Sequence, residues 1–103
     1  MRGSHSGRPI MALLDLLGRR WTLRILWELR SGVLNFRELR EACGGMSPSV
    51  LNLRLRELRE AGIVSLQDGG GYLLSEPGRQ LLSALAPLQG WADRWASRGG
   101  RGS

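Results

Sequence analysis

A short stretch in the middle of the chain combines side chains that suit contact with the base edges of DNA. Ser49, Asn52 and Arg56 supply a hydroxyl, an amide and a guanidinium, and Leu53 adds an apolar group. Amides pair well with adenine, guanidiniums with guanine and apolar groups with the methyl of thymine. At about 100° per residue, these four side chains share one side of a helix. The pattern therefore predicts a helix over 47–61, the reading helix, that presents a polar face to the major groove.

The same stretch carries the signals that begin and end a helix. Ser47 can cap the first free amides, Pro48 suits the first helical position because it has no N–H, and Gly62 permits a left-handed exit. The face opposite the polar one is apolar and is predicted to pack on a core. It carries Leu51, Leu55 and Leu58. Taken alone, these features also fit an ordinary amphipathic surface helix, so the neighbouring elements decide between the two interpretations.

The element before the reading helix is predicted to be a helix over 36–43. Asn35 followed by Glu38 forms a capping box, and two glycines after this helix allow a tight turn into the next one. Two helices joined in this way are a helix-turn-helix candidate. Arg37 and the Ser47 cap are predicted to contact phosphate, which positions a protein on DNA without reading sequence. The predicted DNA-binding residues are Arg37, Ser47, Pro48, Ser49, Asn52, Leu53 and Arg56.

The sequence after the reading helix predicts a β-hairpin. Two short apolar runs, 63–67 and 72–75, flank a turn at 68–71 that holds an aspartate and three glycines. A hairpin directly after a recognition helix is the wing of a winged helix. Earlier in the chain, residues 33–34 can form only a short strand. The chain is therefore predicted to be mainly α with a small β-hairpin, in a winged helix-turn-helix fold.

Helices are also predicted near both ends of the domain. Residues 10–17 are predominantly apolar around the whole helix, which is typical of a helix packed between two parts of a protein or between two subunits. A further helix opens at Arg19 or Arg20. The last helical region begins after residue 75 and runs to about residue 97. It contains Pro87, which lacks a backbone N–H and is predicted to kink or split the helix into two segments.

The apolar surfaces of the first and last helices need cover that the chain is too small to supply. A domain of 103 residues buries only about two thirds of its unfolded surface and often relies on a partner subunit. We therefore predict a homodimer that joins these helices. The predicted contacts are Leu13, Leu14, Leu17, Leu88, Trp91 and Trp95. Aromatic walls at such a seam can admit a flat apolar molecule, so sensing of a small aromatic effector is an alternative.

The composition limits the class of protein. Net charge is +6, and all 15 basic residues are arginine; four of them lie in Gly/Ser-rich ends, which leaves 11 against nine acids and makes the basic character local. No apolar run approaches the roughly 20 residues that span a bilayer, so a membrane protein is not expected. The ends, 1–8 and 98–103, are predicted to be a disordered leader or tag and a flexible tail around a domain over 9–97.

No group of residues converges in a way that predicts an enzyme. The single histidine, His5, lies in the leader, the acids alternate with arginines, and no metal-ligand spacing or phosphate-binding loop occurs. Neither a metal nor a cofactor is therefore expected. The single cysteine, Cys43, is interpreted as a small core residue rather than a redox switch. A lone cysteine without a signal peptide predicts a reducing, cytoplasmic environment.

The order of these elements and several motifs resemble the HxlR family of winged-helix transcriptional regulators. The resemblance extends from about residue 12 to residue 95. The matching motifs, in chain order, are Leu17-Gly18-Arg19-Arg20-Trp21-Thr22-Leu23, Asn35-Phe36-Arg37-Glu38-Leu39, Leu55-Arg56-Glu57-Leu58, Gly62-Ile63-Val64 and Tyr72-Leu73-Leu74-Ser75. Trp91 is similar to a late tryptophan of the family. The resemblance implies a homodimeric regulator, most simply a repressor, that grips two half-sites about one helical turn apart.

Three features depart from the family pattern. The turn 68–71 is shorter than the usual wing and lacks its arginine, and Cys43 stands where the family has leucine, with no cysteine near the amino end. Leu53 occupies the middle of the reading face, where a polar residue is usual, which predicts a thymine-rich step or a lower affinity for DNA. Leu53 and the arginine-free wing also support a rival interpretation, a winged helix used for protein association. Salt-dependent DNA binding distinguishes the two, because phosphate contacts weaken as salt rises.

Overall fold

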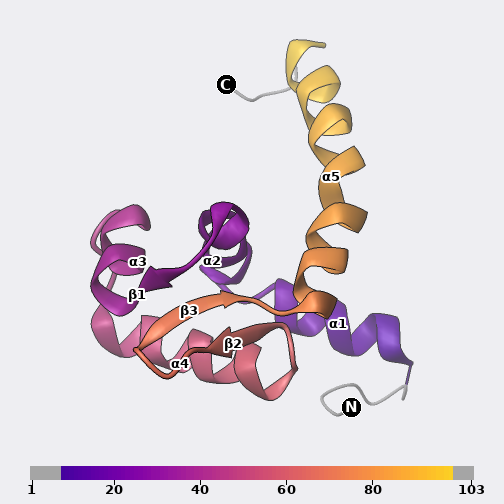
Figure 1. Ribbon diagram of the computed structural model, residues 1–103. Coiled ribbons are helices and arrows are strands. Elements are labelled where there is room, and N and C mark those ends of the chain that lie inside the picture. Colours follow the sequence, from indigo (N-terminus) through magenta and orange to yellow (C-terminus); the bar gives the residue numbers. More distant parts are fainter. Residues whose placement is uncertain (1–7, 99–103) are drawn as a thin grey trace.

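The computed structural model describes residues 8–98, which form five α-helices, one 3₁₀ turn and a three-stranded sheet (Figure 1). The elements in chain order are α1 (Pro9–Leu17), α2 (Thr22–Glu28), the 3₁₀ turn η1 (Leu29–Ser31), β1 (Leu34–Asn35), α3 (Phe36–Ala42), α4 (Pro48–Glu60), β2 (Val64–Leu66), β3 (Gly71–Leu74) and α5 (Glu76–Ser97). This order confirms the predicted mainly α winged helix-turn-helix with its hairpin. The predicted leader and tail lie, apart from Arg8 and Arg98, outside the described residues.

The core lies where α2, α3 and α4 meet the sheet. The three leucines predicted for the inner face of α4, Leu51, Leu55 and Leu58, are buried there together with Ile25 and Leu26 of α2. The predicted inner face of the reading helix is therefore confirmed. An apolar stripe along one side of a helix turns that side inward and leaves the opposite side exposed.

The junction between α1 and α2 differs from the prediction in two ways. α2 starts at Thr22 rather than at Arg19 or Arg20, because Trp21 adopts a left-handed conformation with φ 81° and such a residue cannot lie inside a helix. Leu17, at the end of α1, packs in the chain's own core and is only 8% exposed. It therefore has little surface left for the partner contact that the sequence predicted.

β3 lies in the middle of the sheet, with β1 and β2 antiparallel on either side of it. β2 and β3 form the predicted hairpin, and Val64 faces Leu74 across it. The strand predicted at 33–34 is shifted by one residue and pairs with β3. A Cβ on Gly71 would lie 2.4 Å from Cγ1 of Val33, the residue before β1, so a larger residue at position 71 would require the Val33 side chain to shift.

A tight joint connects the hairpin to α5. Ser75 caps the helix: its Oγ accepts the Gly78 N–H at 3.1 Å and donates to the Gly62 carbonyl oxygen at 2.6 Å. Gly78 is buried, and a Cβ at this position would come within 2.2 Å of the Ile63 carbonyl oxygen. The first turn of α5 thus packs directly on the backbone that follows α4.

Pro87 does not split the last helix, so this part of the prediction is wrong. α5 continues from Glu76 to Ser97 with Pro87 inside it. Proline lacks the N–H that would bond to the carbonyl of Ser83 and crowds that turn, but Ser83 and Pro87 are both exposed, so these effects fall on the solvent side of a helix that continues beyond Pro87. Beyond this point α5 rises away from the other elements (Figure 1), and residues 91–98 are all exposed. No described helix combines the length and the apolar character that crossing a membrane requires.

Candidate nucleic-acid interface

The turn between α3 and α4 fixes where α4 begins. At the start of α3, the Asn35 side chain accepts the Glu38 N–H at 2.8 Å and the Glu38 side chain accepts the Asn35 N–H at 2.9 Å, which confirms the predicted capping box. Both glycines at 44–45 have positive φ, a conformation that residues with a Cβ rarely adopt. Arg40 Nε donates to the Met46 carbonyl at 2.6 Å and braces the turn just before α4.

The first turn of α4 presents hydroxyl and backbone donors to the surface. Ser47 caps the helix by accepting the Val50 N–H at 3.4 Å, and Pro48 occupies the first helical position, as predicted. Ser49 Oγ lies 3.1 Å from Ser47 Oγ. Its backbone N–H belongs to the first turn, where a helix supplies no acceptor of its own. Because Ser47, Pro48 and Ser49 are all exposed, this helix end is open to a negatively charged group.

The polar side of α4 is open along its length. Ser49, Asn52 and Arg56 are exposed, and Leu53 is 39% exposed between them. Within residues 8–98, neither the Asn52 amide nor the Arg56 guanidinium forms a hydrogen bond or an ion pair. The structure therefore brings the four predicted base-contacting residues together on one face and leaves the Asn52 amide and the Arg56 guanidinium available.

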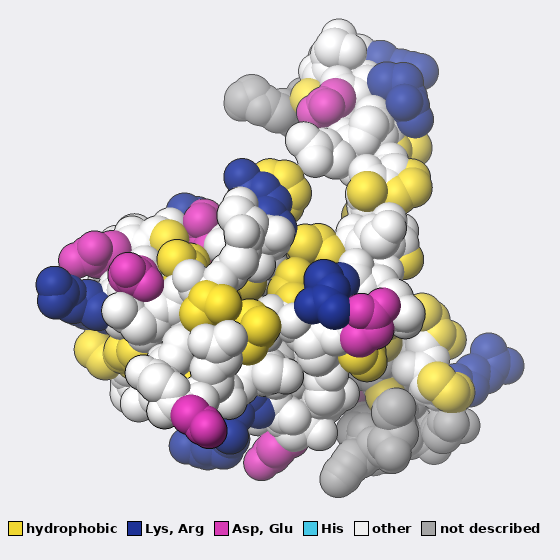
Figure 2. All heavy atoms as spheres, in the orientation of Figure 1, with side chains coloured by type: hydrophobic (Ala, Val, Ile, Leu, Met, Phe, Trp, Pro, Cys, Tyr) yellow, Lys and Arg dark blue, Asp and Glu magenta, His cyan; other side chains and the backbone are white. Residues whose placement is uncertain are grey.

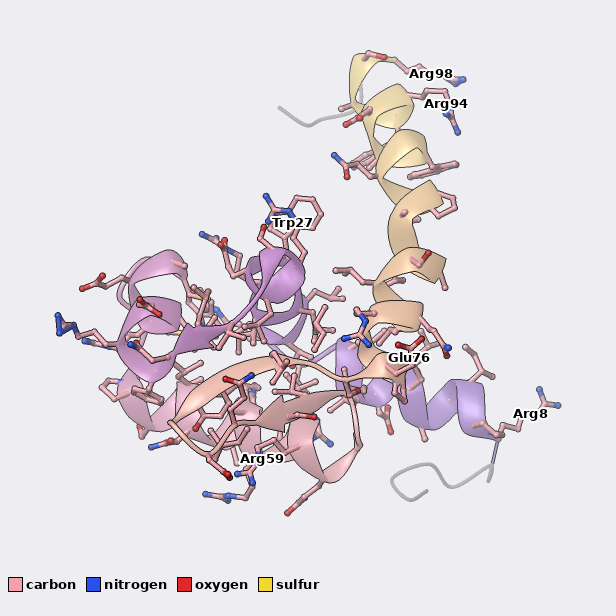
Figure 3. The ribbon with its side chains drawn as sticks, in the orientation of Figure 1. Arg8, Trp27, Arg59, Glu76, Arg94 and Arg98 are labelled. Atoms are coloured by element: carbon pink, nitrogen blue, oxygen red, sulfur yellow. The ribbon has the colours of Figure 1, made fainter. Side chains whose placement is uncertain are left out.

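Other arginines near this face differ in position. Arg59, near the end of α4, points away from the body of the molecule (Figure 3). Arg37, the predicted phosphate contact, lies on α3; its side chain is 83% exposed and its Nε is 4.0 Å from Glu41 Oε2. On the face drawn in Figure 2, basic and acidic side chains are interspersed, which agrees with a local rather than a general basic character.

The wing carries no cation. Its turn is closed by hydrogen bonds from the Gly70 N–H to the Gln67 carbonyl, 2.9 Å, and from the Gln67 N–H to the Gly71 carbonyl, 2.7 Å. The sequence has no arginine or lysine between residues 60 and 78, and Asp68 in the turn is exposed. The groups that suit DNA are therefore concentrated on α4.

Sequence reasoning missed how α4 is held against the loop 18–21. Within α4, Arg54 pairs with Glu57 at 3.1 Å between Nη1 and Oε1. Glu57 Oε2 also pairs with Arg19 Nη1 at 3.0 Å, and Arg54 Nε donates to the Arg20 carbonyl at 2.8 Å. The partners in these last two contacts are more than 30 positions apart in the sequence, so no local residue spacing predicts them.

Cys43 is a buried residue of the core, as predicted. Burial raises the pKa of its thiol; among nearby charges, Arg24 lowers that pKa and Glu28 raises it. A smaller fraction of the thiol is ionised at neutral pH than in an exposed cysteine, so its reactivity is reduced. Among residues 8–98, no three histidine, cysteine or acidic side chains are grouped closely enough to hold a metal ion.

Most residues predicted to form a dimer seam lie on exposed parts of α1 and α5. Leu14 is 53% exposed on α1, and Leu88 and Trp91 are 58% and 54% exposed on α5. Trp91 and Trp95 stack nearly parallel, with ring centroids 6.0 Å apart and planes 16° apart. Leu13 is half-buried against the core. The two helices thus carry exposed apolar side chains that a partner could cover.

A comparison with curated proteins supports this architecture. A family model described as HxlR-like helix-turn-helix matches residues 16–99. An HTH-type transcriptional regulator of Mycobacterium tuberculosis is 37% identical over 98 residues, which cover 89% of this chain and 61% of the relative. The chain therefore spans about three fifths of the length of this and similar mycobacterial relatives.

Solved structures show the same fold. The quinone-bound YodB from B. subtilis matches with a TM-score of 0.78 and 35% identity, over 84% of this chain and 98% of that one. A possible HxlR family transcriptional factor from Thermoplasma volcanium matches with a TM-score of 0.75 and 28% identity, over 87% and 86% of the two chains. Because the winged helix-turn-helix and the family model both extend over most of its length, the chain belongs to the HxlR-like helix-turn-helix family, whose named relatives are transcriptional regulators and not enzymes.

Proposed function

We propose that this chain is a homodimeric, sequence-specific DNA-binding regulator that places α4 in the major groove. The observation that carries the proposal is the division of α4 into a buried leucine face and an open face with Ser49, Asn52, Leu53 and Arg56. Because Asn52 and Arg56 have no polar partner within the described residues, their side chains are available to base edges. Membership in a family of transcriptional regulators supports the same function.

Contacts to the DNA backbone would come from the ends of the two helices. The Ser47 cap, Pro48 and the Ser49 N–H lie at the positive end of α4, where a phosphate is favoured. Arg37 supplies a well-solvated cation at the start of α3. These contacts set the position and orientation of the protein on the duplex, while base recognition falls to the open face of α4.

Repression is the simplest consequence of such binding, because a dimer that covers a promoter excludes polymerase. In cells without a nucleus, this activity is exercised in the cytoplasm. A reporter placed behind a promoter that contains the selected site tests the sign of regulation. Repression predicts that expression of this chain lowers the reporter signal and that removal of the site restores it.

Selection of bound fragments from a random DNA pool tests the proposed reading face. The unaltered protein is expected to enrich a sequence with two-fold symmetry. Asn52→Ala and Arg56→Ala remove exposed groups that form no hydrogen bond or ion pair within the described residues, so both variants are expected to keep the fold. Each is expected to lose about 1–3 kcal/mol of discrimination, and to relax the preference at its own base position.

Arg59→Ala is the matched control, since it removes the same charge from the edge of the same helix. It is expected to weaken binding to all sequences alike and to leave the preference unchanged. The proposal is contradicted if both reading-face variants enrich the original sequence as strongly as the unaltered protein. Binding that does not weaken with rising salt would instead favour the rival function in protein association.

A second candidate function is a response to a small aromatic molecule at the dimer seam. The near-parallel pair of Trp91 and Trp95, both about half exposed, is the observation that favours it. YodB, a structural neighbour, is quinone-bound. Naphthoquinone is therefore a suitable probe: calorimetric titration should give saturable heat with the unaltered dimer and none with Trp91→Ala. An equally flat titration with both proteins would remove this candidate.

A further inference from the structure

One flank of α4 is tied to the loop between α1 and α2 by four groups, which we call the α4 clamp. Glu57 pairs with two arginines at once: Oε2 lies 3.0 Å from Arg19 Nη1, and Oε1 accepts a hydrogen bond from Arg54 Nη1 at 3.1 Å. Arg54 Nε donates to the backbone carbonyl of Arg20 at 2.8 Å. The clamp therefore joins two positions on α4, one helical turn apart, to two consecutive residues of the loop.

Burial makes this ion-pair cluster more rigid than a typical surface pair. The side chains of Arg54 and Glu57 are only 17% and 19% exposed, so water competes weakly for their hydrogen bonds. Hydrogen bonds between charged groups are also stronger than neutral ones. The loop that receives them contains Trp21 in a left-handed conformation, which persists only when surrounding contacts hold it.

The clamp supplies a constraint that the apolar core does not. Leu51, Leu55 and Leu58 turn one side of α4 inward, but apolar contact is non-directional and permits small rotations about the helix axis. A hydrogen bond to a fixed carbonyl is directional. Glu57 lies about 40° around the helix from Leu53, at the edge of the reading face.

We propose that Arg54 and Glu57 are positioning residues of the reading face. They fix the rotation of α4 so that Asn52 and Arg56 meet their bases together, and neither contacts DNA itself. This inference rests on the proposed DNA-binding function and deepens it. It assigns to a largely covered arginine and an acid a role that their charges alone would not suggest.

The direction in which one substitution changes DNA affinity separates a positioning role from a simple electrostatic effect. An acid beside a DNA-binding face repels phosphate, so its removal ordinarily raises affinity for every sequence. Positioning predicts the opposite for the specific site: Glu57→Gln should lower specific affinity by about three- to tenfold, while affinity for unrelated DNA stays the same or rises. Arg54→Ala should lower specific affinity similarly without changing the slope of binding against salt, because Arg54 displaces no counterion.

Glu60→Gln is the matched control for charge. Glu60 is an exposed acid at the end of the same helix, and it forms no ion pair within the described residues. Its removal should leave specific affinity unchanged or slightly higher. Arg19→Ala provides an independent break in the clamp through a more exposed residue. Combined with Glu57→Gln, it should cause no further loss of specific affinity, since both changes open the same contact.

Mobility shifts on the selected site and on unrelated DNA, with the folded fraction of each variant checked by circular dichroism, test the proposal. It is overturned if Glu57→Gln and Arg19→Ala bind the specific site as tightly as Glu60→Gln, or if Arg54→Ala reduces the salt slope by about one. If Glu57→Gln does not fold, Arg19→Ala is compared with Arg59→Ala, which removes the same charge. The proposal is overturned if the ratio of specific to unrelated DNA affinity is the same in these two variants. Failure of the unaltered protein to bind DNA in a salt-dependent way overturns the proposed function itself, and the role of the clamp with it.

Discussion

At position 78 the fold accepts only a hydrogen atom as side chain. The Ile63 carbonyl oxygen would lie 2.2 Å from a Cβ there, and the backbone that carries this oxygen is itself held by Ser75. Neither partner is the flexible end of a long side chain, so a methyl group could be accommodated only by moving α5 away from the sheet.

Gly78→Ala is therefore expected to lower the free energy of unfolding by about 1–3 kcal/mol, a typical cost of overpacking. Urea denaturation followed by circular dichroism measures this change. Gly69→Ala is the control, because a Cβ at position 69 meets nothing within 4 Å; it should stay within about 0.5 kcal/mol of the unaltered protein. Equal stability of the two variants would contradict the tight joint.

Single residues were predictable where their role is local. Ser47, Pro48 and Gly62 were assigned correctly because caps and exits depend on side chains within one turn of the helix end. The left-handed Trp21 was not predicted, since nothing in its neighbours demands that conformation. The pairing of Arg19 with Glu57 depends on the fold as a whole and has no local signature.

At the scale of elements, α3 depends on its capping box, which also sets where the turn into α4 begins. Asn35→Ala removes the acceptor of the Glu38 N–H and should destabilise the chain by about 1 kcal/mol. The first turn of α3 should fray, so hydrogen exchange at the Glu38 amide should become faster than in the unaltered protein.

Asn35→Asp is the control for this helix start, because it keeps the accepting oxygen and adds charge that favours a helix N-terminus. Its Glu38 amide should remain protected. Loss of protection in both variants would show that contacts other than the cap hold this turn.

The order and type of the helices and strands were predictable from the sequence. Their exact boundaries and the pairing between strands were less predictable. Apolar periodicity and glycine turns located α4 and the hairpin correctly. The pairing of β1 with β3 was not predicted, because it joins segments far apart in the chain. Pro87 was misjudged because the effect of a proline inside a helix depends on its surroundings: Ser83 and Pro87 are both exposed, and α5 continues through them.

For the whole molecule, the exposed apolar residues of α1 and α5 predict the oligomeric state. Replacing both Trp91 and Trp95 by alanine should weaken self-association by at least about 100-fold, since aromatic anchors contribute most of the energy at such seams. Sedimentation equilibrium at several concentrations measures the change in dissociation constant.

Leu53→Ala is the control, as it removes an exposed apolar side chain from the reading face instead. It should remain a dimer. A double tryptophan variant that sediments like the unaltered protein would place the seam elsewhere. Of the dimer residues that the sequence named, Leu17 is a core side chain, and the contacts between α4 and the loop 18–21 had no signal in the sequence.

The close fit of α5 onto the backbone that follows α4 has a consequence for the binding site on the chromosome. If α5 joins the two subunits, the angle and separation between the two reading helices are set in advance, and DNA must match them. One inserted base pair turns the second half of the site by about 35° around the duplex axis. Because α5 is fixed rigidly at its first turn, the second reading helix cannot follow that rotation. Such a dimer should tolerate changes in the identity of the base pairs between the half-sites but not changes in their number.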